Sequence, residues 1–191
     1  MAAKEELLNA HHHSSRVYHG GAERLRSGER LAGLEIPRVV GLCLSGIEAA
    51  SVLDLGTGTG VFAEAFTVAG VAATGIDLNP DFLAMARTLV PQAVFLEATA
   101  DDLPCDDGAH DLVFIGLALH EVDNPLGVLR EARRVARLRV AVLEWPWKES
   151  TQGPPLEHRL KPDQIATLAE QAGFIRTETT ELTYLSLYIL E

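Results

Sequence analysis

The stretch Val52-Leu-Asp-Leu-Gly-Thr-Gly-Thr-Gly60 decides the fold of this chain. Its apolar first half predicts a buried strand, and glycine then stands at every second position of the turn that follows. Glycine lets the backbone bend tightly and lie against a ligand where a Cβ atom would collide. A second predicted strand, residues 71–76, leads into Asp77, whose carboxylate is placed to accept hydrogen bonds from both hydroxyls of a ribose. The pattern indicates an α/β domain that binds a nucleoside.

The spacing of the glycines distinguishes between nucleoside classes. Dinucleotide-binding turns follow G-x-G-x-x-G, but here Val61 stands where the third glycine is required, and its branched side chain would obstruct close helix–strand packing. The turn also lacks the Lys-Ser/Thr pair of a phosphate-binding loop. Asp54 would repel a pyrophosphate, but it suits a ligand with an amino group and a sulfonium. S-adenosylmethionine is such a ligand.

Segments beyond the turn carry a resemblance to a family. Residues 100–114 look like an acid-Leu-Pro turn followed by the D-x-V of a fourth strand, and residues 119–125 and 129–135 look like the loop and helix after it. With the glycine turn, they make the chain similar to class I S-adenosylmethionine-dependent methyltransferases. The similarity is greatest to the small type-11 group that includes ubiquinone and menaquinone C-methyltransferases. It covers roughly residues 51–145, and residues 159–174 match a later helix.

The resemblance implies a cofactor site in four parts of the chain. The glycine turn would approach the methionine portion, with Asp54 near its amino group directly or through water, and Asp77 would hold the ribose. Gly116 and Leu117 would lie under the transferring methyl group. The implied cofactor-binding residues are Asp54, Gly56, Thr57, Gly58, Gly60, Asp77, Leu78, Thr99, Ala100, Asp101, Gly116 and Leu117.

The chain departs from the family pattern at two places. Thr99 stands where the family commonly has an acid for the adenine amino group, so either Thr99 makes a weaker hydrogen bond or Asp101 takes over the contact. The Lys/Arg-Pro-Gly-Gly turn expected after the helix is also missing, because residues 135–140 contain no glycine. This connection must be shorter or differently shaped.

His120 and Glu121 are the candidate catalytic residues. They follow the predicted fourth strand at the mouth of the crevice, and a histidine there can take a proton near neutral pH. The alternative is structural: Glu121 ties down the loop and His120 packs on the next helix. Trp145 and Trp147, after the next strand, would form an apolar wall for an organic acceptor or a rim of packing aromatics.

Periodicity predicts alternating strands and helices. Strands are expected at residues 51–55, 71–76, 93–97, 111–116 and 139–144, helices at 61–69 and 80–89, and a hairpin from 174–178 and 183–190. With the family resemblance, these elements predict a Rossmann-like class I methyltransferase fold: a mostly parallel seven-stranded sheet with an antiparallel C-terminal strand and helices on both faces. We expect one compact α/β domain, in which residues 51–191 bind S-adenosylmethionine and residues 1–50 form an N-terminal helical lid that includes Tyr18.

Composition narrows the partners. Sixteen basic against 27 acidic side chains leave a net charge of −11, which disfavours nucleic acid, and we expect the arginines of residues 130–139 to form a solvated helix face. No apolar run reaches the roughly 20 residues of a membrane span. The two cysteines, Cys43 and Cys105, show no paired spacing and predict free thiols in the cytoplasm. No metal site is expected, because the adjacent residues His11 to His13 cannot all face one ion.

These features predict methyl transfer from S-adenosylmethionine to a small-molecule acceptor. Two alternatives remain: a non-catalytic protein that binds S-adenosylmethionine or S-adenosylhomocysteine, and a nicotinamide-dependent oxidoreductase. The sequence leaves open the acceptor and the oligomeric state.

Overall fold

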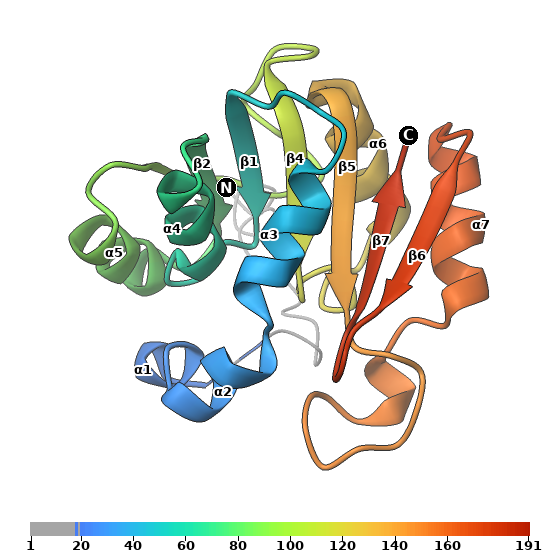
Figure 1. Ribbon diagram of the computed structural model, residues 1–191, viewed down its shortest axis with the longest axis horizontal. Coiled ribbons are helices and arrows are strands. Elements are labelled where there is room, and N and C mark those ends of the chain that lie inside the picture. Colours follow the sequence, from blue (N-terminus) through green and yellow to red (C-terminus); the bar gives the residue numbers. More distant parts are fainter. Residues whose placement is uncertain (1–17, 19) are drawn as a thin grey trace, which may run out of the picture.

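A seven-stranded sheet forms the centre of the protein, and its strand order is β3-β2-β1-β4-β5-β7-β6 (Figure 1). The computed structural model describes residue 18 and residues 20–191. All neighbouring strands are parallel except that β7 runs antiparallel to both β5 and β6. The strands are β1 (Ser51–Leu55), β2 (Ala72–Asp77), β3 (Val94–Glu97), β4 (His110–Gly116), β5 (Ala136–Glu144), β6 (Thr177–Glu181) and β7 (Ser186–Leu190).

Helices cover both faces of the sheet. One apolar cluster joins α3, α4 and α5 to the sheet, and a second cluster on the other face joins α6 and α7 to it. The central strands are buried on both sides, as their continuous apolar runs require: residues 112–115 and 140–143 are at most 1% exposed. The helices are α1 (Ala22–Leu25), α2 (Gly28–Gly33), α3 (Ile36–Leu44), α4 (Val61–Val68), α5 (Pro80–Leu89), α6 (Pro125–Val135) and α7 (Pro162–Ala172), with a 3-10 turn at Leu156–His158.

The strand order creates a switch point between β1 and β4. From β1 the chain moves outward to β2 and β3, then returns to β4 on the other side of β1. In open α/β sheets, ligands bind at the carboxyl ends of the strands beside such a switch point. In Figure 1 the arrowheads of β1, β4 and β5 point toward the end of the molecule where α1 and α2 lie. The fold therefore places two short N-terminal helices at the edge where a ligand is expected.

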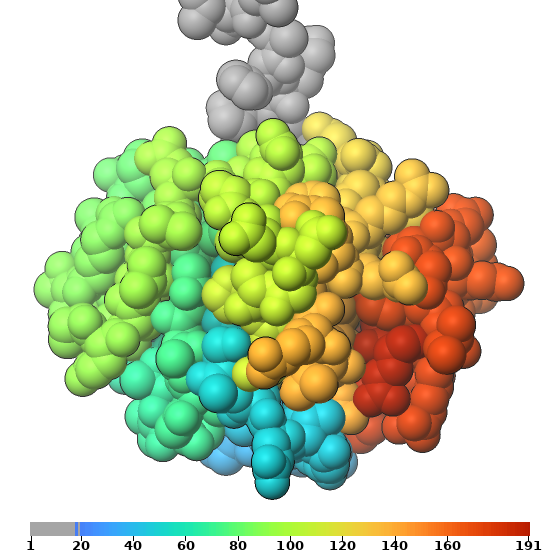
Figure 2. Space-filling model, turned by 90° about the horizontal axis from the view of Figure 1, so that it is seen from above, coloured from blue at the N-terminus to red at the C-terminus, as the bar shows by residue number. Residues whose placement is uncertain are grey.

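Loops cover the opposite end of the sheet, where the parallel strands begin. Figure 2 views the molecule from that end. The segment before β1 (cyan), the turn before β4 (yellow-green) and the end of the chain (red) meet there. Arg139 donates hydrogen bonds to the carbonyls of Cys43 and Ser45 and forms an ion pair with Glu191. These contacts tie the chain's last residue to the loop that follows α3.

The predicted fold is confirmed, and several element bounds need correction. The last two strands lie at Thr177–Glu181 and Ser186–Leu190, not at 174–178 and 183–190. Because β6 is a polar edge strand, its sequence has no apolar alternation to mark its start. The predicted strands at 71–76, 93–97 and 111–116 are each displaced by a residue at one or both ends, and β5 begins three residues before 139.

The connection that lacks the family's glycine turn is very short. Helix α6 ends at Val135 and β5 begins at Ala136, so no loop residue stands between them. Consequently Arg137 and Arg139 lie on β5, and the expectation that they belong to a solvated helix face was wrong. Arg137 pairs with Asp111 of β4 across the sheet, and Arg139 is 11% exposed in its side chain.

The N-terminal 50 residues divide into two parts. Helix α3 buries Val39, Val40 and Cys43 in the first apolar cluster, so it is part of the core, whereas α1 and α2 bury no side chain fully. His11 to His13 lie outside the described residues. In the described part of the chain, no helix is both long and apolar enough to cross a membrane.

Candidate functional site

The glycine turn joins β1 to α4, and a buried carboxylate holds its shape. Asp54 is 2% exposed. Its Oδ2 accepts hydrogen bonds from the hydroxyl of Thr57 (2.7 Å) and from the backbone N–H of Ala63 in the first turn of α4 (3.2 Å). Burial raises the pKa of Asp54 to about 7, although these two hydrogen bonds act in the opposite direction. The carboxylate faces the turn itself, so the water-mediated form of its predicted contact with a ligand fits this burial better than the direct form.

Two glycines of the turn have left-handed backbone conformations, and at Gly56 a close neighbour also excludes a side chain. Gly56 has φ of +67°, and a Cβ atom there would lie 2.5 Å from the Cβ atom of Ala118. Gly58 has φ of +54°, and a Cβ atom there would lie 3.2 Å from the Cδ1 atom of Leu25 in α1. The turn is therefore enclosed between the loop after β4 and the first N-terminal helix.

Asp77 ends β2 and connects it to the glycine turn. Its Oδ2 accepts a hydrogen bond from the backbone N–H of Gly58, and its Oδ1 accepts one from that of Asn79, both at 2.8 Å. The side chain is partly buried, and this burial raises its pKa. Beside it, Leu78 is 62% exposed. The two backbone hydrogen bonds fix the position of the Asp77 carboxylate at the end of β2.

The residues predicted to meet the adenine lie after β3. Thr99 and Ala100 are partly buried, whereas Asp101 is exposed. In the described structure no side-chain hydrogen bond fixes any of the three, so the choice between Thr99 and Asp101 stays open. The backbone that follows them is held firmly, because the N–H of Leu103 donates to Glu131 of α6 (3.0 Å).

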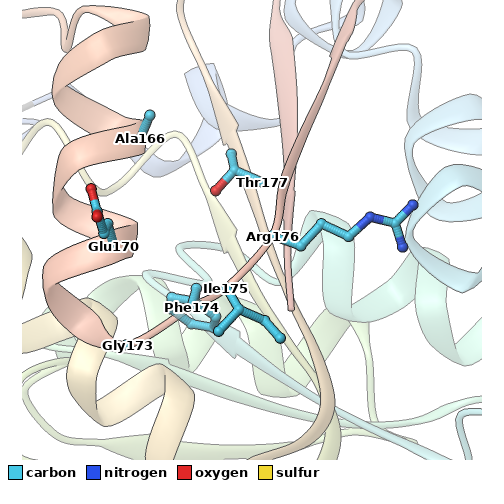
Figure 3. Close-up of a pocket in the computed structure, with 7 residues that line it drawn as sticks. All are labelled: Ala166, Glu170, Gly173, Phe174, Ile175, Arg176 and Thr177. Carbon is cyan, nitrogen blue, oxygen red and sulfur yellow. The ribbon is translucent and has the colours of Figure 1, made fainter.

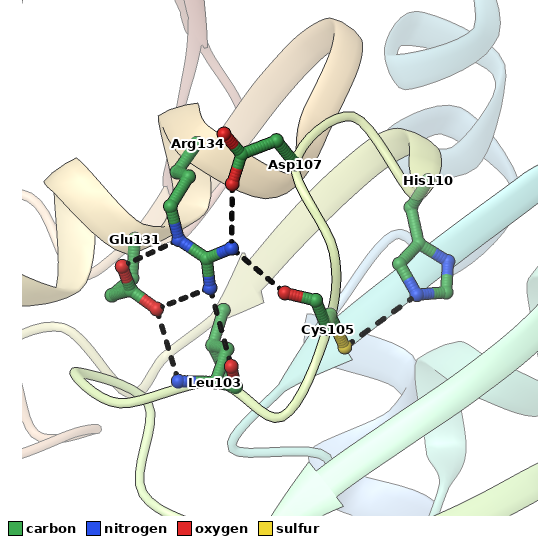
Figure 4. Close-up of polar contacts among 6 residues, drawn as sticks. All are labelled: Leu103, Cys105, Asp107, His110, Glu131 and Arg134. Atoms are coloured by element: carbon green, nitrogen blue, oxygen red, sulfur yellow. Dashed lines mark hydrogen bonds and ion pairs between the residues drawn. The ribbon is translucent and has the colours of Figure 1, made fainter.

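Arg134 of α6 is the centre of the contacts that hold this turn (Figure 4). Its guanidinium donates hydrogen bonds to the carbonyls of Leu103 (3.2 Å) and Cys105 (2.7 Å), and it forms ion pairs with Glu131 and Asp107. The expectation that Arg134 lies on a solvated helix face was wrong, because its guanidinium donates to four acceptors and joins α6 to the Leu-Pro turn.

The end of β4 carries a strained residue. Leu117 has φ of +58°, a conformation that residues with a Cβ atom rarely adopt. It is held there by burial, with 6% exposure, and by the hydrogen bond from its N–H to the carbonyl of Leu143 (2.8 Å). Such strain clusters at ligand sites. Leu117 and the preceding Gly116 were both predicted to lie beneath the reacting methyl group.

The structure brings His120 and Glu121 together with a residue that sequence analysis did not identify. Glu144, the last residue of β5, is 1% exposed, and its Oε2 lies 2.8 Å from Nδ1 of His120. The second imidazole nitrogen, Nε2, lies 3.8 Å from Oε1 of Glu121. The available signal was an acid directly after the apolar run of residues 140–143, in the strand next to the one that His120 follows. The two tryptophans that follow β5 differ in exposure: Trp145 is half-buried, and Trp147 is 37% exposed.

Two described residues that precede α3, Tyr18 and Arg26, contact this end of the sheet. The backbone N–H of Tyr18 donates to Oε2 of Glu121 (3.2 Å), and the Tyr18 ring lies 6.2 Å from that of Phe82. Arg26 donates two hydrogen bonds to the carbonyl of Thr59 in the glycine turn and pairs with Glu64 of α4 (2.7 Å). Arg26 thus joins the end of α1 to the glycine turn and to α4.

A surface depression of about 480 Å³ lies elsewhere, between the end of α7 and the start of β6 (Figure 3). Glu170 and Ile175 are among the residues that line it, and Ile175 is 97% exposed. None of the predicted site residues lines this depression. The depression is therefore separate from the candidate site at the carboxyl ends of the strands.

Comparisons with known proteins agree with this geometry. A family model described as a methyltransferase domain matches residues 53–140. The demethylmenaquinone methyltransferase of Tropheryma whipplei is 36% identical over 166 aligned positions, which cover 70% of each chain. An uncharacterized methyltransferase of Mycobacterium tuberculosis is 38% identical over 86 residues, 45% of this chain. The chain spans 35% of the length of that mycobacterial relative.

Solved structures show the same fold. A SAM-dependent methyltransferase from Aquifex aeolicus superposes with a TM-score of 0.78 at 23% identity, covering 88% of this chain and 95% of that one. Together, the family model, the relative that matches over most of its length and the superposition support one assignment. This chain belongs to the class I S-adenosylmethionine-dependent methyltransferases, in the type-11 group.

Proposed function

We propose that this protein transfers a methyl group from S-adenosylmethionine to a small organic acceptor. The observation that carries the proposal is the hydrogen bond from Gly58 to Asp77. It joins the glycine turn to the carboxylate at the end of β2, directly beside the switch point of the sheet. The same two groups would face the methionine and ribose portions of one ligand.

The proposed roles follow from these positions. Asp77 accepts hydrogen bonds from the ribose hydroxyls, and the backbone of residues 56–60 lies along the methionine portion. Thr99, Ala100 and Asp101 border the adenine, with Leu78 against its apolar face. Gly116 and Leu117 support the methyl group, and His120 and Glu121 stand on the acceptor side.

Methyl transfer depends mainly on the alignment of the acceptor atom with the methyl group of the cofactor. The cofactor, when bound, supplies a methyl group on a positively charged sulfur, which leaves without help from an acid. The protein's contribution is to hold the acceptor in line with that methyl group, and positioning of this kind can contribute about 7–11 kcal/mol to the barrier reduction. Two features would keep the two reactants in place: the fixed backbone at Leu117, and the buried Asp54 that holds the glycine turn in shape.

The acceptor is proposed to be a small molecule. Relatives carry the names demethylmenaquinone methyltransferase and malonyl-[acyl-carrier protein] O-methyltransferase, so both a quinol and a malonyl thioester with its free carboxylate belong in an acceptor screen. The net charge of −11 argues against nucleic acid. The free thiols of Cys43 and Cys105 support a reducing compartment, and the cytoplasmic location stays a prediction.

The test is transfer of a labelled methyl group. Purified protein is incubated with methyl-labelled S-adenosylmethionine and with hydroquinones, phenols, amines and carboxylic acids, and labelled products are separated. Label in an organic product, with S-adenosylhomocysteine formed in equal amount, supports the proposal. Tight binding of both sulfur nucleosides without turnover of any acceptor would favour the non-catalytic binding protein. Preferential binding of NAD would favour the oxidoreductase.

A further inference from the structure

His120 and Glu144 form a buried pair at the acceptor side of the crevice. The carboxylate of Glu144 accepts three hydrogen bonds: from Nδ1–H of His120 (2.8 Å), from the backbone N–H of His120 (3.1 Å) and from the backbone N–H of Trp145 (3.2 Å). His120 is 4% exposed and Glu144 is 1% exposed. A carboxylate this enclosed is costly unless its neighbours donate to it, and here they do so from two adjacent strand ends.

This pairing sets the tautomer of His120. An ionised carboxylate can only accept, so the proton of the neutral imidazole stays on Nδ1 and leaves a lone pair on Nε2. Among the described residues, Nε2 has no hydrogen-bond partner, and the Oε1 atom of Glu121 lies 3.8 Å from it. The lone pair is therefore available to a proton donor that enters beside Glu121.

The charged groups around the imidazole are Glu144 on β5, Glu121 on the loop after β4, and Arg159 after the 3-10 turn. Burial would lower the pKa of His120, but the hydrogen bond and charge of Glu144, with the charge of Glu121, outweigh burial and the opposing charge of Arg159. The pKa is raised as a result. Arg159 itself is occupied, since it donates to the carbonyls of Pro154 (2.9 Å) and Lys148 (2.8 Å) and to others of the same loop.

From this geometry, and on the basis of the proposed function, we propose that His120 removes a proton from the methyl acceptor through Nε2, with Glu144 as its positioning residue. The acceptor is then a molecule with an O–H or N–H proton to lose. Carboxylate acceptors are disfavoured, because an ionised carboxylate has no proton for His120 to take.

The step balances. The lone pair of the acceptor oxygen or nitrogen forms the new bond to the methyl carbon. At the same time the carbon–sulfur bond breaks, and the electron pair of that bond stays on sulfur. The acceptor proton passes to Nε2, which makes His120 an imidazolium beside Glu144 and Glu121. That proton then leaves to solvent as the product departs. No oxidant, reductant or further reactant is required.

The acid beside Nε2 has a partner of its own. The backbone N–H of Tyr18 donates to Oε2 of Glu121 (3.2 Å), whereas Oε1 of Glu121 is the oxygen that lies 3.8 Å from Nε2 of His120.

The first test is spectroscopic and needs no acceptor. ¹⁵N NMR of labelled protein is expected to show His120 in the Nδ1–H form when neutral, with a titration midpoint above that of an unperturbed histidine. In Glu144→Gln, the glutamine amide can donate to Nδ1 and so move the proton to Nε2, and the midpoint falls. The matched control is Glu170→Gln, on the exposed surface of α7, which should leave the tautomer and the midpoint unchanged (Figure 3).

The second test is turnover with three defined probes: 1,4-naphthohydroquinone, 2-phenylethylamine and phenylacetate. Methyl transfer to the hydroquinone or the amine, but not to phenylacetate, is expected, with a rate that rises with pH through the titration of His120. His120→Ala should lower the rate by about 10²-fold or more. Glu144→Gln should lower it less and move the pH midpoint downward, whereas S-adenosylmethionine affinity stays within about twofold, a change worth only about 0.4 kcal/mol.

The two proposals fail differently. If the wild-type protein does not bind S-adenosylmethionine, the proposed function is wrong. If the protein binds the cofactor but methylates phenylacetate in preference to both protic probes, or methylates none of the three, the acceptor class is wrong. If Glu144→Gln leaves the tautomer, the pH midpoint and the rate as in wild type, the role of the pair is wrong even though methyl transfer stands.

Discussion

The hydroxyl of Thr57 donates a hydrogen bond of 2.7 Å to the carboxylate of Asp54, which is buried beneath the glycine turn. The same oxygen accepts the N–H of Ala63, so one side chain fixes both the turn and the start of α4. Because Asp54 is almost fully enclosed, its ionised form is poorly solvated. The shape of the turn therefore depends on a group whose protonation changes near neutral pH.

This relationship predicts a pH dependence of stability. The folded-state pKa of Asp54 is raised to about 7, so the folded state binds a proton more tightly than the unfolded state does. The contribution of Asp54 to the free energy of unfolding should be greatest below about pH 4 and should decrease as pH rises toward 7. Asp54→Asn keeps an acceptor oxygen but cannot ionise, so it should gain stability relative to wild type over this window. Urea unfolding of both proteins from pH 4 to pH 8 measures the difference, and a difference that is constant with pH would refute it.

Gly56 and Ala118 give a prediction about steric fit. Gly56→Ala should reduce the free energy of unfolding by about 2 kcal/mol or more, because it combines a left-handed backbone with an overlap against Ala118. Adding Ala118→Gly removes the overlap but not the backbone strain, so the double variant should recover only part of the loss. Thermal unfolding of the two single variants and the double variant completes the cycle. Strict additivity would mean that the two residues do not meet as described.

Arg134 predicts a link between α6 and the turn that borders the adenine. Arg134→Gln loses ion pairs with Glu131 and Asp107 and hydrogen bonds to two carbonyls, and since the side chain is 31% exposed the cost should be about 1–2 kcal/mol. Affinity for S-adenosylmethionine should fall with it. Arg130→Gln, at an exposed position of the same helix, is the control and should change neither quantity. Equal effects of the two substitutions would contradict the role given to Arg134.

The contacts of Arg26 give a prediction about the role of α1. Its hydrogen bonds to Thr59 and its ion pair with Glu64 hold α1 against the glycine turn. If α1 retains the bound ligand, Arg26→Ala should speed dissociation of S-adenosylmethionine more than it slows association. Stopped-flow displacement measures both rates, with Arg24→Ala on the exposed side of α1 as control. Unchanged dissociation would show that α1 does not retain the cofactor.

Local signals were sufficient to predict much of this protein. The alternation of glycines after β1 and the proline that starts α5 are local features, and the bounds of these two elements were predicted correctly. The start of β6 was not predictable, because a polar edge strand buries too little to leave an apolar pattern.

The part of the site that was missed depends on contacts between distant residues. His120 and Glu144 are 24 positions apart in the sequence. They come together because β4 pairs with β5 up to Gly116 and Leu143, so that both strands end side by side. Arg26 reaches the glycine turn across 33 positions from a helix of four residues. Neither periodicity nor motif spacing encodes such pairs, since both patterns describe only the local chain.

The central claim is that the crevice beside β1 and β2 binds S-adenosylmethionine through Asp77. Titration calorimetry with S-adenosylmethionine, S-adenosylhomocysteine and NAD tests it most directly, on wild type, on Asp77→Ala and on the exposed control Asp81→Asn. We predict that wild type and Asp81→Asn bind both sulfur nucleosides and not NAD. Asp77→Ala should bind them at least about tenfold more weakly, the loss expected when hydrogen bonds to a charged group are removed. Equal affinity of Asp77→Ala and wild type, or preferential binding of NAD, would contradict the account.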